Sequence, residues 1–391
     1  MAGRPGWPNP DTDPVNRDDS GSLAWLRRRR QERLDAMTER VLLRMTTVDV
    51  GARPGRSLPG LAAALLVLPV HVLTVALAAG GLTAVLAGDG WVLKLAGVLA
   101  LALAVLLRPH PGAMPEHVAL LRPGDAPALF RLLGEVGAHT RAPVPHVVVV
   151  SSQFNATASL SGLRRRVLEI GAPLWIAADH QARVALLGHE LGHFAHGDLR
   201  SSVWVGSGFR ALSRWHYLAH PGDDLNIVEL VALAPLRWAI AGYLSVLDVL
   251  NASASRRQEY LADLAAAHAG GTDGATALMD TLLAMPTVEA AMTRAALNRA
   301  GGPPMWDLVR DDVTGRRDSR VARRRTESAE RNRADSSHPL TTLRIRLLEA
   351  RPRESAGVVP DAGTWAQIDA ELADGLARAE REAADEIRYV R

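Results

Sequence analysis

The sequence predicts a mostly α-helical α+β protein with one small β-sheet, preceded by a hairpin of two apolar helices. Three observations support this fold class. No charged side chain occurs between Ser57 and Gly88. Short β-rich runs are confined to one region, whereas apolar residues at helical spacing extend over most of the remaining chain. One apolar helical run, ALLGHELGHFAHGD at 185–198, carries three histidines and a glutamate.

The apolar hairpin is predicted at residues 57–108. Its first run exceeds the roughly 20 apolar residues that cross a bilayer. A second run at 91–107 follows a Gly-Asp-Gly turn. A secretory signal peptide is a poorer interpretation, because the apolar run begins far from the first residue and another follows it. A buried hairpin of a soluble protein is the alternative. We expect a multi-pass protein of the cell membrane, with the lipid bilayer as a partner.

Arginines predict the orientation of this hairpin. Many precede the first run, Arg108 follows the second, and the connecting loop carries only Asp89. Since positive residues favour the cytoplasmic side, we expect the large domain after Arg108 to face the cytoplasm. A formal net charge of +3 is too small to imply nucleic-acid binding. The absence of cysteine excludes disulfides and thiolate metal ligands.

The chain divides into five segments. We expect residues 1–56 to be a disordered and basic cytoplasmic segment, residues 57–108 to form the hairpin, and residues 109–309 to form the main domain. Residues 310–337 are an Arg-rich linker, with a solvated helical face as the alternative. Residues 338–391 are helices that complete the main domain.

Within the main domain, the pattern predicts helices at 126–139 and 180–196 and three strands at 146–152, 154–162 and 165–171. We expect turns at Gly162 and Gly171.

A later stretch, 228–250, approaches the hydrophobicity of a membrane span but contains Pro235, Arg237 and Asp248. A single crossing would separate the two parts of the site described below. We therefore expect a helix that is buried or lies on the membrane, with a true pair of spans as the alternative.

The run HELGH at 189–193 matches the HExxH motif. On a helix, His189 and His193 lie on one face a single turn apart, so both can bind one Zn²⁺. Glu190 lies about 100° around the helix, where it can take a proton from an attacking water. Gly192 is expected to keep the face near the ion uncrowded. The alternative is two core histidines and a surface glutamate.

A catalytic zinc needs a third protein ligand. His196 would lie roughly 10 Å along the helix from His189, too far to share an ion easily. Glu259 and Asp263, four residues apart on a later helix, are better placed. Glu259 could complete a His₂Glu set, and Asp263 could accept a hydrogen bond from a ligand histidine. For this pair, a solvated acidic stripe is the alternative.

The order of these motifs resembles the HtpX-like membrane metallopeptidases, a family that also contains the CAAX prenyl proteases. HELGH is followed by HGD, EYLAD and SSHPLTTLRIRLLE, behind an N-terminal apolar hairpin. The resemblance implies a zincin-like domain and one Zn²⁺ per chain. It implies His189, His193 and Glu259 as ligands and Glu190 as the catalytic base.

The resemblance also implies residues that contact the substrate. FNATAS resembles the family's strand beside the cleft, which would place Asn155 and Ala156 where an extended polypeptide pairs. His338 resembles a histidine that helps to hold the oxyanion, with a helix start at Pro339 as the alternative.

By this resemblance the substrates are membrane or misfolded polypeptides. Two other functions stay open at this point: an antirepressor-type sensor protease and a non-catalytic membrane scaffold with a structural metal. The oligomeric state is open as well.

Overall fold

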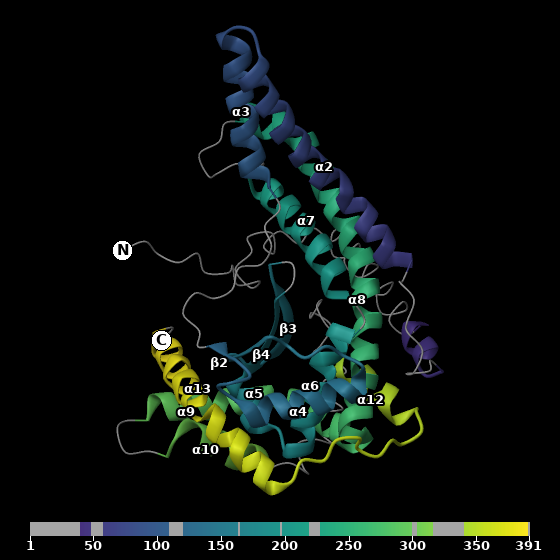
Figure 1. Cartoon of the computed structure of the whole chain (residues 1–391), viewed down its shortest axis with the longest axis vertical. Coiled ribbons are helices and arrows are strands. Elements are labelled where there is room, and N and C mark those ends of the chain that lie inside the picture. The colour runs from purple at the N-terminus through teal and green to yellow at the C-terminus, as the bar shows by residue number, and fades with distance from the viewer. Residues whose placement is uncertain are drawn as a thin grey trace.

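The computed structural model describes residues 40–47, 58–108, 120–162, 165–195, 198–218, 227–298, 303–315 and 340–389 (Figure 1). In this part of the chain, helices dominate and surround one four-stranded sheet. The long helices α2, α3, α7 and α8 rise from a base that contains the sheet and the remaining helices (Figure 1). The predicted mostly helical class with a small sheet is confirmed.

The helices are α2 (Leu58–Ala87), α3 (Trp91–Leu107), α4 (Pro127–Thr140), α5 (Ala172–Ala177), α6 (His180–Ala195), α7 (Asp198–Leu218), α8 (Ile227–Leu283), α9 (Met285–Leu297), α10 (Met305–Thr314), α12 (Thr341–Glu349) and α13 (Ala362–Tyr389). The strands are β1 (Leu120–Leu121), β2 (Val147–Ser151), β3 (Ala156–Ser161) and β4 (Arg165–Gly171). The predicted helices at 126–139 and 180–196 and the three predicted strands are confirmed.

The sheet has the order β1-β2-β4-β3, with β2 parallel to β4 and the other pairs antiparallel. Both faces of β2 are covered, which explains its uninterrupted valines. Val148 and Val150 enter the main core, whereas Val147 and Val149 pack with Val167 on the other face. β3 stands at the end of the strand order, so one of its edges faces away from the sheet.

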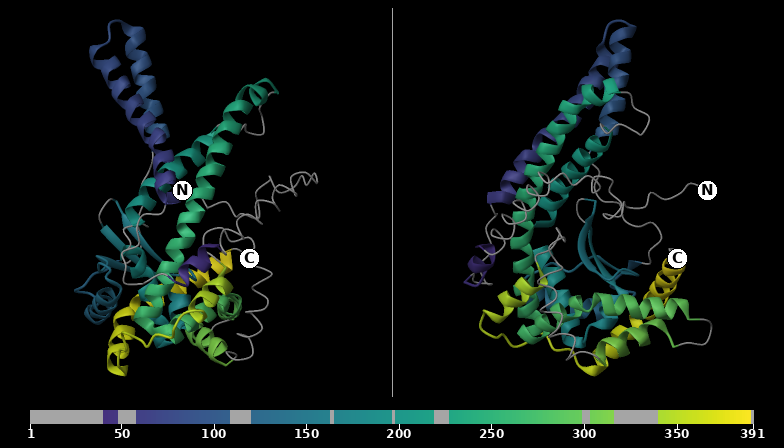
Figure 2. Two further views of the ribbon diagram at one scale, coloured as in Figure 1. Left: turned by 90° about the vertical axis from the view of Figure 1, so that its right-hand side faces the viewer. Right: turned by 180° about the vertical axis from the view of Figure 1, so that it is seen from behind.

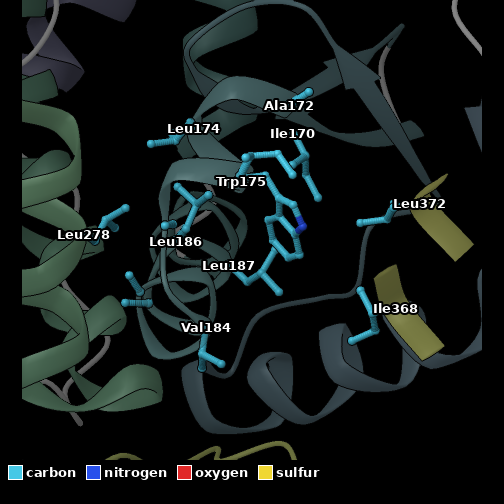
Figure 3. Close-up of a cluster of buried hydrophobic side chains, with 14 of the residues drawn as sticks. Ile170, Ala172, Leu174, Trp175, Val184, Leu186, Leu187, Leu278, Ile368 and Leu372 are labelled. Carbon is cyan, nitrogen blue, oxygen red and sulfur yellow. The ribbon is translucent and has the colours of Figure 1, made fainter. Parts of the chain in front are cut away.

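The main core lies between the sheet, α6, α8 and α13. Trp175 is fully buried near its centre, between Leu187 of α6 and the α13 side chains Ile368 and Leu372 (Figure 3). Leu278 of α8 closes another side (Figure 3). Burial of such large side chains stabilises the fold by about 1.5–3 kcal/mol each.

Two carboxylates of helix α13 accept hydrogen bonds from the N-termini of α4 and α10. The carboxylate of Glu371 accepts hydrogen bonds from the main-chain N–H groups of Ala128 and Leu129, at 2.7 and 2.9 Å. Glu380 accepts one from Met305 at 2.8 Å. Each carboxylate satisfies N–H groups that lack a partner within their own helix and complements the positive end of the helix dipole.

Helices α2 and α3 form a hairpin whose backbones approach closely at two glycines. A Cβ atom on Gly81 would lie 2.9 Å from the carbonyl oxygen of Gly97. Among the described helices, α2 is long and apolar enough to cross a membrane, and α3 is apolar but shorter. Their apolar side chains are largely exposed, as in Leu82 and Val92.

The stretch 228–250 belongs to α8, a helix that continues to Leu283 with a break at Gly271, where φ is 76°. One face packs against α2 and α7, but Leu236 and Trp238 on another face are 53% and 79% exposed. No described element covers that face, so this part of the helix is not fully buried, and the expectation that it lies on the membrane stays a prediction.

The prediction of a linker at 310–337 is wrong for its first residues. Residues up to Thr314 are helical in α10, because Met305, Trp306 and Val309 bury one face of that helix. Residues 316–337 lie outside the described part of the chain.

Candidate metal centre

The site depends on a close contact between α6 and α8, made by small side chains. A Cβ atom on Gly188 would lie 2.9 Å from Cβ of Ala269, and one on Gly192 would lie 3.1 Å from Cβ of Ala265. The role expected for Gly192 was wrong. It faces α8 and allows the two helices to approach, which brings the carboxylates of α8 to the histidines of α6.

Three side chains from these helices converge. Nε2 of His189 lies 3.3 Å from Nε2 of His193 and 3.5 Å from Oε2 of Glu259. Nε2 of His193 lies 3.8 Å from Oε1 of Glu259. His189 and Glu259 are buried, and His193 is partly exposed. Within the described residues, these three form a group able to hold a metal ion.

The separations of these atoms fit a zinc ion. Zinc binds imidazole nitrogen and carboxylate oxygen at about 2.0–2.2 Å in tetrahedral geometry, which places neighbouring ligand atoms roughly 3.3–3.5 Å apart. Two of the three separations fall in this range and the third exceeds it by a few tenths of an ångström. A set of two neutral imidazoles and one carboxylate leaves a fourth position, as catalytic zinc sites do.

Asp263 lies behind His189, as its spacing from Glu259 predicted. Its Oδ1 is 3.1 Å from Nδ1 of His189, and its side chain is fully buried. In this contact Nδ1 of His189 carries the proton and donates to the carboxylate of Asp263. The other ring nitrogen, Nε2, then faces Glu259 and His193.

The sequence reasoning missed Arg344 of α12. Its Nε and Nη2 donate to the two oxygens of Asp263, at 2.9 and 2.6 Å, and Nη2 lies 4.0 Å from Oε2 of Glu259. Arg344 is 5% exposed. The sequence carried one sign that Arg344 is buried. In TLRIRLLE it lies between Leu343 and Ile345, a pattern that is unusual for an exposed helix face.

The buried charges shift each other's pKa values. Burial alone would raise the pKa of Asp263, but the charge of Arg344 and hydrogen bonds from His189 and Arg344 lower it. Burial would lower the pKa of His189, but hydrogen bonds to Asp263 and Glu259 outweigh it and raise this pKa to about 9. A cation must therefore displace a proton from His189, because only a neutral imidazole is a ligand.

Glu190 joins the site to the edge of the sheet. Its Oε2 accepts a hydrogen bond of 2.8 Å from the main-chain N–H of Ala158 on β3. The carbonyl oxygen of Asn155 accepts a hydrogen bond from Gly171, on the β4 side. Because these directions alternate along a strand, Ala156 and Ala158 direct their N–H and C=O groups away from β4.

The structure therefore brings together His189, Glu190, His193, Glu259 and Asp263 beside Ala156. The carbonyl oxygen of Asn155 instead accepts from Gly171, and its N–H donates to the carbonyl oxygen of Gln153 at 2.9 Å. Its side-chain amide donates to Oγ1 of Thr157 at 3.3 Å. His338 and His196 lie outside the described residues, so the expectations for them stay predictions.

Residues 127–352, more than half of the chain, match peptidase family M48. The chain belongs to this family. The match begins at α4 and ends just after α12, so it includes every residue of the candidate metal centre in this M48 peptidase. It confirms the resemblance drawn from the motifs, and M48 is a family of metallopeptidases.

No curated protein and no solved structure matches the chain. The α2–α3 hairpin and α13 of this M48 peptidase lie outside the matched residues.

Proposed function

We propose that this chain is an integral-membrane, zinc-dependent endopeptidase that hydrolyses membrane or misfolded polypeptides on the cytoplasmic side. The observation that carries the proposal is the His189, His193 and Glu259 group, with Glu190 held between it and the edge of β3. Its metallopeptidase family supports the same chemistry. The apolar α2 and the arginines on both sides of the hairpin support the membrane location and the orientation.

In this proposal His189, His193 and Glu259 hold the zinc. When bound, zinc supplies a Lewis acid that polarises the scissile carbonyl and acidifies water. Arg344 holds the carboxylate of Asp263. This carboxylate accepts a hydrogen bond from Nδ1 of His189 and so orients the imidazole. The imidazole of His189 is therefore already oriented before a substrate binds, so it does not have to reorganise during the reaction.

Glu190 acts as the general base. It takes a proton from the attacking water and passes it to the nitrogen of the leaving amine, so that its carboxylate is regenerated. An extended substrate adds to the outer edge of β3, where Ala156 offers its main-chain N–H and C=O groups and Ala158 offers its C=O. Ala158 already donates to Glu190, so the substrate lies directly beside the base.

A non-catalytic scaffold explains this arrangement less well. A structural metal needs a closed set of ligands but no base at the edge of an accessible strand. The contact between Glu190 and Ala158 therefore favours the enzyme.

The test is zinc content together with cleavage of unfolded casein by the full chain, purified in mild detergent. We expect about one zinc per chain and cleavage that stops with 1,10-phenanthroline and returns with zinc. The His193→Ala variant should lose both zinc and cleavage. Cleavage by protein that contains no zinc would contradict the proposal.

A further inference from the structure

An apolar groove of about 660 Å³ lies between the α2–α3 hairpin and the upper parts of α7 and α8. The two helix pairs diverge upward from a shared base (Figure 2, left). All four helices line the groove, and their contributions include Val70, Leu73, Leu106, Trp215, Ile240 and Tyr243. Its volume is within the usual range of sites for small ligands.

The polar atoms of the lining are already bonded within the protein. The hydroxyl of Tyr243 donates to the carbonyl oxygen of Leu66. The indole Nε1 of Trp215 donates to the carbonyl oxygen of Leu107 at 3.2 Å. The groove therefore presents a hydrocarbon surface, and an apolar occupant is favoured over water.

Positive charge adjoins this surface. The hydrogen bond between Trp215 and Leu107 joins two residues that line the groove, and each has an arginine as its chain neighbour. These arginines, Arg214 and Arg108, are both exposed. Exposed arginines next in the chain to two lining residues can supply guanidinium groups to the phosphate of a lipid whose acyl chain enters the groove.

We propose that the groove binds one acyl chain of an anionic membrane phospholipid, with the phosphate against Arg108 and Arg214. A polypeptide helix fits less well, because it is about 10–12 Å wide with its side chains, so a single turn already takes up most of the 660 Å³ of the groove. An extended peptide would bring N–H and C=O groups that the groove cannot satisfy. The bound lipid would link the hairpin to α7 and α8. Lipid binding at this groove rests on the proposed membrane location but not on the metal centre or on peptidase activity.

The experiment is native mass spectrometry of the full chain, delipidated in detergent and titrated with dioleoyl phosphatidylglycerol or dioleoyl phosphatidylcholine. We expect one phosphatidylglycerol to be retained at concentrations at which phosphatidylcholine is not. Ala239→Trp, which fills the groove, should abolish retention, whereas Ala79→Trp on the exposed hairpin surface should not. Arg214→Gln should weaken phosphatidylglycerol about fivefold, whereas Arg381→Gln on α13 should have no effect.

Circular dichroism and thermal unfolding identify variants that fail to fold. If Ala239→Trp is one of them, Arg214→Gln still tests the proposal, because it changes an exposed residue. Equal retention by the wild type and a folded Ala239→Trp protein would overturn the proposal. Equal retention of the two lipids by the wild type, or no effect of Arg214→Gln, would overturn the phosphate contact. Retention of a polyleucine helix in preference to either lipid would identify a polypeptide as the occupant and overturn the proposal.

Discussion

Arg344 holds both carboxylate oxygens of Asp263 in the protein interior, through Nε at 2.9 Å and Nη2 at 2.6 Å. Asp263 in turn lies 3.1 Å from Nδ1 of His189. The pair thus connects α12, α8 and α6, three helices from separate parts of the chain, through one buried carboxylate. The orientation of a candidate zinc ligand depends on an arginine that is not itself a ligand.

Replacing Arg344 by Met should leave Asp263 as a buried charge without its guanidinium. We expect the free energy of unfolding to fall by about 3–5 kcal/mol. Zinc affinity should fall by about 10–100-fold, because the partner of His189 is no longer held. Urea denaturation and competitive zinc titration measure the two effects. Arg346→Met, on the exposed face of the same helix, is the control. Equal behaviour of both variants would refute the role given to Arg344.

Replacing Glu190 by Gln should remove the base without removing a ligand. We expect kcat for casein cleavage to fall by about 10²–10⁴-fold, while zinc content is unchanged. Metal analysis and a fluorescent casein assay measure this. Glu135→Gln, exposed on α4, should retain both properties. Substantial turnover by the Glu190→Gln protein would exclude the proposed base.

Zinc binding should release protons. The pKa of His189 is about 9 in the protein without a cation, so at pH 7.5 its imidazole is protonated and must become neutral to bind. We expect release of about one proton, and an affinity that rises roughly tenfold per pH unit until the pKa is reached. Calorimetry in buffers of different ionisation enthalpy measures the release. Asp263→Asn should reduce it, because a carboxylate that raises this pKa is lost.

The contact between α6 and α8 should tolerate no added methyl group at Gly188. The new Cβ would lie 2.9 Å from Cβ of Ala269 and 3.1 Å from the carbonyl oxygen of Ala265. We expect Gly188→Ala to destabilise the protein by about 1–3 kcal/mol and to weaken zinc binding, since Glu259 moves with α8. In α4, Gly134 has open space around it, so Gly134→Ala should stabilise by about 0.5–1 kcal/mol. Thermal unfolding separates the two results.

Proline substitutions along β3 should distinguish its two edges. Ala158→Pro removes an N–H that faces Glu190 rather than β4, so we expect the fold to be retained and cleavage to fall. Thr157→Pro removes an N–H directed toward β4 and should destabilise the sheet. Circular dichroism during heating and the casein assay measure the two outcomes. Normal cleavage by Ala158→Pro would show that the hydrogen bond from Ala158 to Glu190 is not needed for catalysis.

Much of the site was predictable because its chemistry is local. His189, Glu190 and His193 occupy one helical turn, and Glu259 and Asp263 occupy another, so helical spacing alone predicts that each group shares a face. The strands β2, β3 and β4 were likewise predictable, β2 from its four consecutive valines and the other two as short segments that end at Gly162 and Gly171. Arg344 was not, because its importance comes from burial beside Asp263, and burial depends on how α12 packs.

The sequence alone determined the apolar hairpin, the helices at 126–139 and 180–196, the three longer strands, and the residue types able to bind zinc. These follow from composition and from periods of 2 and 3.6 residues, which act over a few residues. Only the tertiary structure decided that Gly188 and Gly192 let α6 approach α8, that Arg344 completes the site, and that the hairpin and α7 and α8 enclose a groove. Such features depend on the distance between segments that are far apart in the chain, which no local pattern specifies.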